Sequence, residues 1–572
     1  MQQTLTIALV GSGGAGVAVT GEMLLRAAGK QGYFGLLRKA FGPQIRGGES
    51  AAILRIGNAP IGSFKPTVDV LLALDWANFS RFEDEISITA ETLVFADVLA
   101  GDTPIGLSNA ATVVSLPFSS IAQTHQSDRP NMVALGFLGR MLSINCDFLE
   151  TALLDRLIKK SEDIRLLASN SLRSGYDYEG ANSSLKSLSL PELAEAKDRW
   201  MLSGNQAVGY GALQAGLKFV SAYPITPASD VLEWLAKPIE KVGGHLVQAE
   251  DELAAVNMAI GASYGGVPSL TATSGPGLSL MSEAMGLAVA SETPLVIVNV
   301  QRGGPSTGIP TKSEQSDLNL AIYGLHGDAP HVVLAPLDIA DCITVGASAM
   351  QIAEHLQTLV IILSDQFIGQ SLTVIDQPTT VYEKAQRVTA VVNENAVAYQ
   401  RYSLNESGIS PMAFPGQEGM FYTADGLEHN TTGIPSPKAS DHKSQLEKRR
   451  RKVEQYDFGE QWARVTGEGD SAILCWGSLA SAAEEAIIEF KSLTNTKVIA
   501  LRQLSPFPAE AMKEALEGVN SLIIVEQNQS GQFFHYFKSQ MDYPGELVSF
   551  ATPGPLPINA YDIAQFLEGV RA

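Results

Sequence analysis

The chain has 572 residues, of which 45% are apolar, and 61 acidic residues against 40 basic ones give a net charge of −21. One hydrophobic core does not serve such a length, so we expect about three or four domains. The acidic balance disfavours nucleic-acid binding, which needs clustered Lys and Arg. No apolar run reaches the ~20 residues that span a bilayer, and residues 1–10 predict a buried first strand instead of a signal peptide.

The first predicted domain covers residues 1–190 and alternates strands with helices, which predicts a mainly parallel sheet. Its first strand, 4–10, is followed by a glycine loop, Gly11-x-Gly13-x-x-Gly16, that resembles the dinucleotide fingerprint. That fingerprint also needs an acid about 20 residues further on to hold ribose, and residues 31–39 contain none. A nicotinamide nucleotide is therefore disfavoured, and the loop serves helix–strand packing or contacts another phosphate. Further strands are expected at 50–56, 68–74, 92–95 and 112–115.

A second unusual element of this domain is Arg46-Gly-Gly-Glu49, in which a flexible backbone separates opposite charges. A ligand loop and a simple turn both explain it.

The second predicted domain covers residues 191–377 and is again α/β. An extended connector with one charged helix follows at 378–455, and a smaller α/β domain closes the chain at 456–572. The basic run Lys448–Lys452 lies in the connector, and we interpret it as a solvated face. Strands are expected in these parts at 218–222, 244–248, 269–273, 294–300, 331–334, 358–363, 471–475, 497–501 and 521–525.

Four motifs of the second domain follow short apolar strands, where open α/β sheets bind their ligands. They are Tyr223-Pro-Ile-Thr226-Pro, Gln248-Ala-Glu250-Asp-Glu, Thr273-Ser-Gly275-Pro-Gly and Arg302-Gly-Gly-Pro-Ser-Thr-Gly-Ile-Pro-Thr311.

Glu250 follows a strand and opens a helix. A carboxyl group at the mouth of a parallel sheet, held in an apolar wall, can activate the aminopyrimidine of thiamine diphosphate, whose thiazolium carbon must lose a proton. The alternative is that Glu250, Asp251 and Glu252 only complement the helix dipole.

The neighbouring motifs favour a ligand site. Two prolines rigidly bracket Thr226 and present its hydroxyl, and the glycines after Thr273 allow close backbone approach. Arg302 is expected at the rim of the cleft, where its guanidinium suits a bidentate grip on a carboxylate. An interdomain or subunit ion pair is the alternative for Arg302.

On these four motifs, together with Gly11–Gly16, Arg46–Glu49, Gly408-Ile-Ser-Pro and Glu447-Lys-Arg, the chain resembles the α subunit of the 2-oxoacid:ferredoxin oxidoreductases. It is most similar to the 2-oxoglutarate type, in which a γ domain precedes α. The resemblance implies a multidomain α/β fold: a Rossmann-like γ domain, a thiamine-diphosphate-binding (pyrimidine-type) domain and a C-terminal domain like that of transketolase.

The resemblance also implies the reaction: reversible oxidative decarboxylation of a 2-oxoacid with coenzyme A, giving acyl-CoA and carbon dioxide, with electrons passed to ferredoxin. Glu250 corresponds to the carboxylate at the thiamine ring, and Thr226 and Arg302 to the residues that bind the 2-oxoacid. The remaining cofactor-binding positions are Tyr223, Pro224, Ile225, Ser274 and Gly275.

Half of such a site is missing from this sequence. There is no Gly-Asp-Gly motif to hold the diphosphate through Mg²⁺, and the three cysteines, Cys146, Cys342 and Cys475, are too few and too far apart for a [4Fe–4S] cluster. We therefore predict no metal site on this chain and expect both groups on a β subunit. The two subunits are expected to form an (αβ)₂ assembly that passes electrons to ferredoxin through the β subunit. Separated cysteines also fit a reducing cytoplasm.

Several alternatives stay open. Pyruvate and branched-chain 2-oxoacids compete with 2-oxoglutarate as the substrate. A nicotinamide-dependent dehydrogenase using Gly11–Gly16, a non-oxidative thiamine enzyme and a non-catalytic assembly subunit are the other classes.

Overall fold

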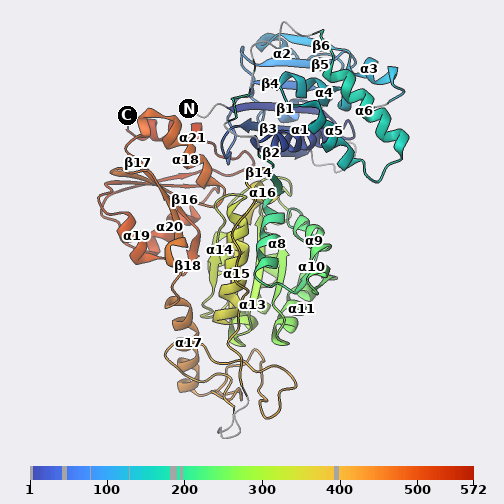
Figure 1. The fold of residues 1–572 in the computed structure, drawn as a ribbon. Coiled ribbons are helices and arrows are strands. Elements are labelled where there is room, and N and C mark those ends of the chain that lie inside the picture. The colour runs from blue at the N-terminus through green and yellow to red at the C-terminus, as the bar shows by residue number, and fades with distance from the viewer. Residues whose placement is uncertain are drawn as a thin grey trace. The chain divides into compact units, whose positions relative to one another are not determined.

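The computed structural model describes residues 4–41, 48–77, 79–127, 129–180, 188, 190–193, 197–391 and 399–571. They form two compact units, and each is described by itself (Figure 1). The first contains residues 1–203, 370–379 and 559–565, and the second contains 204–369, 380–558 and 566–572. The predicted division into four domains remains a prediction.

The first unit is built on one mixed sheet with the strand order β6-β5-β4-β1-β3-β2-β14-β7. Its strands are β1 (Thr4–Ser12), β2 (Phe34–Phe41), β3 (Glu49–Gly57), β4 (Val70–Ala73), β5 (Leu93–Asp97), β6 (Val113–Leu116), β7 (Trp200–Ser203) and β14 (Leu372–Ile375). Its helices are α1 (Val17–Gln31), α2 (Ile105–Ala110), α3 (Phe118–Thr124), α4 (Pro130–Met141), α5 (Cys146–Arg156) and α6 (Glu162–Tyr176).

The prediction of a mainly parallel sheet holds for only half of this unit. Strands β1, β4, β5 and β6 pair in parallel, whereas β3, β2, β14 and β7 pair antiparallel. The sequence argument missed β2, because it looked in this segment for a parallel second strand with a ribose-binding acid. Since β2 instead forms an antiparallel pair with β3, such an acid has no equivalent position here.

The Gly11–Gly16 loop is packed against its own unit. The backbone N–H and the hydroxyl of Ser12 both donate to Oδ2 of Asp75, each at 2.8 Å. Gly16 has φ 86°, and a Cβ there would lie 2.3 Å from Nδ2 of Asn131. The loop therefore makes the close helix–strand packing that was one of its two interpretations.

Of the segment 46–49, residues 46 and 47 lie outside the described residues. Glu49 begins β3, is buried, and accepts two bonds from Nη1 of Arg81 at 2.7 and 2.8 Å.

The second unit has a central sheet with the order β18-β12-β13-β11-β10-β8-β9, in which every pair but β12–β18 is parallel. Its strands are β8 (Phe219–Ala222), β9 (His245–Gln248), β10 (Ser269–Thr273), β11 (Leu295–Gln301), β12 (Val332–Leu334), β13 (Leu359–Asp365) and β18 (Gln503–Ser505). The helices along it are α8 (Gly204–Gln214), α9 (Ser229–Leu235), α10 (Pro238–Lys241), α11 (Glu252–Tyr264), α12 (Gly275–Leu280), α13 (Ser282–Ala290), α14 (Leu318–Tyr323), α15 (Asp341–Leu356) and α16 (Gln366–Gln370).

Helices cover both faces of this sheet, which is why its inner strands β10, β11 and β13 are buried along their whole length. Helix α15 contacts β11 and β13 and lies beside α8 (Figure 1). On the other face, α11, α12, α13 and α14 belong to a core that continues into the C-terminal part of the chain. The six strands predicted for this sheet are confirmed, and β18 is an addition that pairs with β12 from far along the chain.

The C-terminal part of the second unit has its own sheet, ordered β15-β17-β16-β19-β20. Its strands are β15 (Ala463–Thr466), β16 (Ser471–Trp476), β17 (Thr496–Leu501), β19 (Ser521–Glu526) and β20 (Glu546–Ala551). The helices here are α18 (Leu479–Glu489), α19 (Ala509–Ala515) and α20 (Gln532–Gln540). Helix α21 (Ala560–Arg571) is divided between the units, with its residues up to 565 in the first and the rest in the second. The three predicted strands correspond to β16, β17 and β19.

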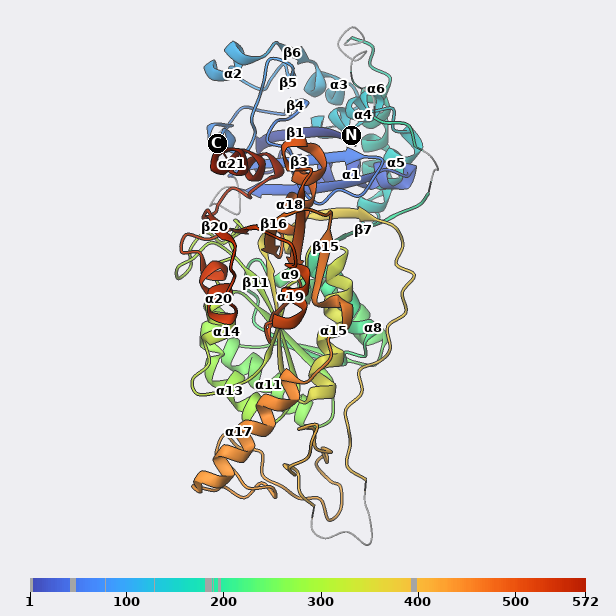
Figure 2. The same cartoon turned by 90° about the vertical axis from the view of Figure 1, so that its left-hand side faces the viewer.

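The connector ends in the predicted charged helix, α17 (Ala439–Glu454) (Figure 2). The interpretation of its basic run as a solvated face is wrong for three of the five residues, because Lys448, Arg449 and Lys452 are buried. Lys448 Nζ bonds both carboxylate oxygens of Glu292, at 2.5 and 2.7 Å. Lys452 Nζ bonds Oε2 of Glu292 at 2.9 Å.

This cluster fastens the connector at the amino ends of the central strands, since Glu292 lies just before β11. Arg401, also buried, donates to the carbonyl oxygen of Glu292 at 2.7 Å. Gly408 packs so closely on α17 that a Cβ would lie 2.7 Å from the carbonyl oxygen of Lys448. A periodicity argument could not find the contacts of Glu292, because it lies over 100 residues from Arg401, Lys448 and Lys452.

Candidate active site

The order of the central sheet brings the four motifs to one edge. Strands β9, β8, β10 and β11 are parallel neighbours, so their carboxyl ends meet there. In the register, Ala222 is opposite Gln248, and Thr273 is opposite Asn299. The loops that carry Tyr223, Glu250, Ser274 and Arg302 therefore leave the sheet side by side.

The turn after β8, residues 223–227, contacts α8 on one side and is exposed to solvent on the other. The amide of Asn205, a buried residue of α8, donates to the carbonyl oxygen of Pro227 at 2.8 Å. Tyr223, Pro224 and Thr226 are exposed, and Ile225 is half-buried. The Thr226–Pro227 peptide bond is cis. Thr226 thus stands on a fixed backbone with its side chain exposed, as the sequence predicted.

Arg302 leaves the end of β11 and points toward this turn. Its Nη1 donates to the carbonyl oxygen of Thr226, so the two residues predicted to bind the 2-oxoacid lie together although 76 positions separate them. The side chain is only 7% exposed, and Nε has no hydrogen-bond partner among the described residues. Burial lowers the pKa of Arg302, and the charge of Asp317 opposes this shift.

The three consecutive acids after β9 have three different positions. Asp251 is the N-cap of α11, and its carboxylate accepts from the backbone N–H of Ala254 at 2.7 Å. Glu252 is buried, and a Cβ on Gly277 would lie 2.8 Å from its Oε1. Glu250 precedes the cap and is exposed. Helix capping therefore needs only Asp251, which leaves Glu250 available at the edge of the site.

The surroundings of Glu250 differ from the expected apolar wall. On this chain its side chain is exposed, so the described residues do not enclose it.

Two buried polar atoms lie unpaired beside the glycine loop. Ser274 Oγ and Asn299 Oδ1 are fully buried and have no hydrogen-bond partner in the described part of the chain. Buried polar atoms are nearly always paired, so these atoms fit a site whose ligand supplies polar partners. These two unpaired atoms are consistent with the predicted binding of a cofactor beside Ser274 and Gly275.

Asp317 is the residue that sequence reasoning left without a role. Its carboxylate accepts from Nδ2 of Asn299 at 2.9 Å, and its backbone N–H donates to Oε1 of Gln301 at 2.9 Å. A Cβ on Gly275 would lie 2.7 Å from its Oδ2. Burial raises the pKa of Asp317 to about 6, although the hydrogen bond from Asn299 acts to lower it. An aspartate before a helix normally indicates an N-cap, so the local sequence does not mark this position as part of a site.

The C-terminal part of the chain fixes the loop that carries Asp317. The backbone N–H of Gln315 donates to the carbonyl oxygen of Gln527 at 2.8 Å, and its side-chain amide donates to that of Trp476 at 2.9 Å. Glu314, on the same loop, accepts from the backbone N–H of Gly304 at 3.3 Å. Burial raises the pKa of Glu314, while this bond opposes the shift.

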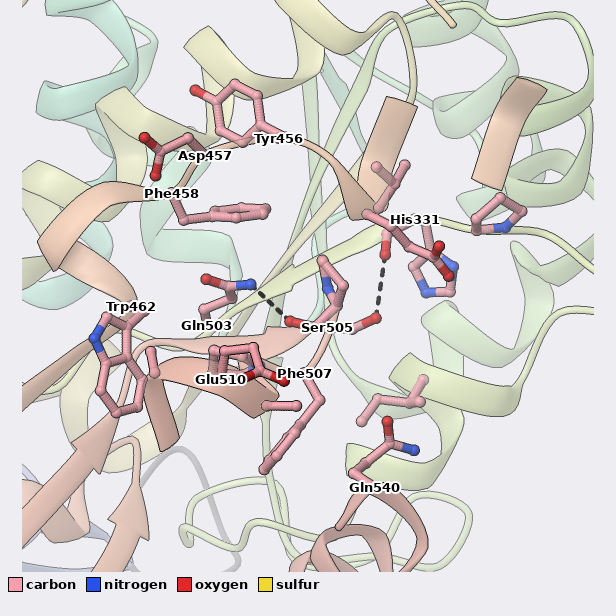
Figure 3. A pocket seen from close by; sticks show the side chains of 18 of the residues that line it. His331, Tyr456, Asp457, Phe458, Trp462, Gln503, Ser505, Phe507, Glu510 and Gln540 are labelled. Atoms are coloured by element: carbon pink, nitrogen blue, oxygen red, sulfur yellow. Dashed lines mark hydrogen bonds between the residues drawn. The ribbon is translucent and has the colours of Figure 1, made fainter. Parts of the chain in front are cut away.

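A cavity of about 670 Å³ lies elsewhere in the second unit. Aromatic side chains line it, among them Tyr456, Phe458 and Trp462, with Ser505 bonded to the carbonyl oxygen of His331 in its wall (Figure 3). None of the predicted site residues lines this cavity.

The described residues were also searched for metal-binding groups and for membrane-spanning helices. Among the described residues, no group of three or more His, Cys, Asp or Glu side chains could hold a metal ion. Within the same residues, no helix is long and apolar enough to cross a membrane.

Loops at the carboxyl ends of neighbouring parallel strands, with unpaired buried polar atoms between them, make this edge of the sheet the candidate ligand site of an α/β protein. Three family models match the chain along its length. Residues 210–448 match "Pyruvate flavodoxin/ferredoxin oxidoreductase, thiamine diP-bdg". Residues 6–178 match "Pyruvate ferredoxin/flavodoxin oxidoreductase", and residues 469–551 match "Pyruvate:ferredoxin oxidoreductase core domain II".

Some relatives of known family match this chain over nearly its full length. A 2-oxoacid:ferredoxin oxidoreductase subunit alpha from Sulfolobus is 30% identical over 91% of this chain and 90% of its own. The 2-oxoglutarate synthase subunit KorA of Methanothermobacter thermautotrophicus is 33% identical over 59% of this chain and 90% of its own. The solved 2-oxoglutarate:ferredoxin oxidoreductase from Magnetococcus marinus superimposes with a TM-score of 0.89 at 34% identity, covering 100% of both chains.

The chain therefore belongs to the family of 2-oxoacid:ferredoxin oxidoreductase α subunits. Enzymes of this family act on the oxo group of their substrate with an iron–sulfur protein as acceptor. The predicted multidomain α/β fold class is confirmed.

Proposed function

We propose that this chain is the α subunit of a 2-oxoglutarate:ferredoxin oxidoreductase. The reaction converts 2-oxoglutarate, coenzyme A and two oxidised ferredoxins into succinyl-CoA, carbon dioxide, two reduced ferredoxins and a proton. The full-length relative from Magnetococcus marinus supports this choice, since it was solved with 2-oxoglutarate, coenzyme A and succinyl-CoA bound. The 2-oxoglutarate synthase relatives from methanogens support it as well.

The contact between Arg302 and Thr226 carries the proposal. One nitrogen of the guanidinium is bonded to the backbone of the turn, which orients the rest of the group. Its Nε is buried and unpaired among the described residues. Arg302 binds the carboxylate of the 2-oxoacid through its free donors, and the exposed hydroxyl of Thr226 donates to the same carboxylate or to the neighbouring carbonyl oxygen.

Glu250 acts on the cofactor at the same edge of the sheet. Thiamine diphosphate, when bound, supplies the carbon nucleophile and electron sink for decarboxylation. Glu250 shares a proton with the aminopyrimidine nitrogen, and Tyr223, Pro224, Ile225, Ser274 and Gly275 form the wall that orients the ring.

A β subunit completes the site in this proposal. Large apolar side chains are exposed on the elements that carry the site: Tyr223 is 40%, Leu253 49% and Leu280 53% exposed. Burying such side chains against a partner is favourable, at roughly 25 cal/mol per Å². The partner also encloses Glu250 and provides Mg²⁺, the [4Fe–4S] cluster and the route to ferredoxin, in an (αβ)₂ assembly of the cytoplasm.

The decisive experiment replaces Glu250 by Gln in the purified complex. Coenzyme A- and 2-oxoglutarate-dependent reduction of a low-potential dye should fall by about 10³-fold, because the amide cannot exchange the proton. The assembly should stay intact by gel filtration. Glu240→Gln, at an exposed position of α10, is the matched control and should keep wild-type turnover. Near-normal turnover of Glu250→Gln would exclude the proposed role.

Substrate choice is tested separately. Rates with 2-oxoglutarate, pyruvate and 2-oxoisovalerate should favour 2-oxoglutarate by kcat/KM. A preference for either of the others would replace the substrate and leave the reaction class standing.

A further inference from the structure

The cavity of about 670 Å³ in the second unit is formed by chain segments that are far apart in the sequence. Its walls come from the end of α14, the segment 329–331, the end of α17 with residues 456–462, β18 with the start of α19, and α20. Cavities of roughly 300–1,000 Å³ accommodate small ligands. Its size is therefore that of a ligand site.

Hydrogen bonds within the chain hold the walls of this cavity. Ser505 Oγ donates to the carbonyl oxygen of His331 at 3.2 Å, and Nε2 of Gln503 donates to that of Pro506 at 2.7 Å (Figure 3). In addition, β18 pairs with β12 of the central sheet. The walls are thus preorganised, and a ligand would have little to order on binding.

Aromatic side chains make up much of the lining. Figure 3 shows Tyr456 and Phe458 on one side of the cavity and Trp462 and Phe507 on the other. The faces of such rings carry negative partial charge and attract cations. All members of this set except Tyr536 are half-buried or exposed, and the set comprises Tyr323, Tyr456, Phe458, Trp462, Phe507 and Tyr536.

The lining also carries negative charge. Glu454, Asp457 and Glu510 are exposed carboxylates, and no Lys or Arg is among the described residues that line the cavity. Glu454 bonds Arg450 at 2.9 Å, and Asp457 accepts from the backbone N–H of Gly459 at 2.8 Å. The carboxylate of Glu510 has no hydrogen bond or ion pair within the described part of the chain.

Two basic side chains near the cavity are already bonded elsewhere in the chain. Nδ1 and Nε2 of His331 lie 2.8 and 2.7 Å from the carbonyl oxygens of Ala329 and Ala321. Arg502, just before β18, bonds the carboxylate of Asp341 and is not part of the lining. The charge of Glu510 is therefore left for a ligand to compensate.

We propose that this cavity binds a small organic cation, an ammonium or guanidinium group on an apolar skeleton. The skeleton packs against the aromatic rings, and the cationic group lies near Glu510 and Asp457. Three carboxylates disfavour an anion, and the net charge of −21 draws cations to the chain. The cavity is independent of the proposed function, because no residue of the candidate active site lines it.

The test is calorimetric titration of phenethylamine, which is protonated at pH 7.5, into the purified complex. A dissociation constant of about 1 mM or below is expected for so small a ligand. The neutral 2-phenylethanol, of equal size, should bind about tenfold more weakly, because it lacks the attraction between cation and ring. The anionic phenylacetate should bind more weakly still.

Two substitutions locate the ligand. Glu510→Gln should weaken phenethylamine binding about two- to fivefold and leave 2-phenylethanol unchanged, and Phe458→Leu should weaken phenethylamine about fivefold. Glu517→Gln, at an exposed position outside the lining, is the matched control and should keep the wild-type affinity. Turnover with 2-oxoglutarate should stay at the wild-type level in all three complexes.

Equal affinities for phenethylamine and 2-phenylethanol, or no binding at about 10 mM, would overturn this inference. The same holds if neither Glu510→Gln nor Phe458→Leu changes the affinity. Binding of the peptide acetyl-Ala-Arg-Ala-amide without binding of phenethylamine would also overturn it, since the occupant would then be a polypeptide segment. Failure of the proposed function would leave these titrations unchanged, because they measure no turnover.

Discussion

Two groups of charged residues in the second unit differ in how completely their side chains are paired. In one, Lys448 and Lys452 bond Glu292 at the amino ends of the strands, and both carboxylate oxygens are paired. In the other, Arg302 and Asp317 lie at the carboxyl ends, and Nε of Arg302 is unpaired in the part of the chain that the structure describes. A fully paired cluster holds a chain segment in place, whereas an incompletely paired one can bind a ligand.

The largest effect should come from breaking the paired cluster. Glu292→Ala leaves two buried ammonium groups without their carboxylate, which costs about 3–5 kcal/mol. The midpoint of urea denaturation should fall accordingly. Glu447→Ala, which removes an exposed partner of Arg450 on the same helix, should leave the midpoint close to that of the wild type. Equal effects of the two substitutions would contradict a structural role for Glu292.

Substitution of Arg302, in the incompletely paired cluster, should change substrate binding and leave stability unchanged. Arg302→Lys keeps the charge but loses the planar fork, so KM for the 2-oxoacid should rise about 10- to 100-fold, or about 1.4–2.7 kcal/mol. The denaturation midpoint should stay close to that of the wild type. Arg450→Lys, at an exposed site, is the control and should leave KM unchanged. A stability loss as large as that of Glu292→Ala would mean that Arg302 is structural too.

A smaller, pH-dependent effect separates the clusters further. Burial alone would raise the pKa of Glu292, but the charges of Lys448 and Lys452 outweigh it and hold the pKa well below its usual range. Because the folded-state pKa is lower than the unfolded value, the contribution of Glu292 to stability is complete above about pH 5 and is lost as the pH falls. The slope is at most about 1.4 kcal/mol per pH unit.

The measurement is the stability difference between wild type and Glu292→Gln in urea, from pH 6 down to pH 3.5. This difference should shrink as the solution becomes more acidic. A difference that is independent of pH in this range would show that the Glu292 carboxylate is not stabilised as its contacts indicate.

The sequence by itself determined the elements that position the site. Apolar runs predicted the strands that become β8, β10, β11, β12 and β13, because a strand buried on both faces must be apolar throughout. The short run before Glu250 predicted β9. The motifs at their ends were specific enough to indicate the family. The missing antiparallel strand β2 shows the limit of that method, since helix–strand alternation alone cannot give strand direction.

Only the tertiary structure decided which charges are buried and what they meet. Lys448 and Lys452 belong to a run of five basic residues that suggests solvent, yet Glu292 lies more than 150 positions away and buries them. Asp317 resembles a helix cap until Asn299 and Gly275 are found around it. The physical reason is the same in both cases: the energy of a charge depends on its neighbours in space, and local sequence specifies only its neighbours along the chain.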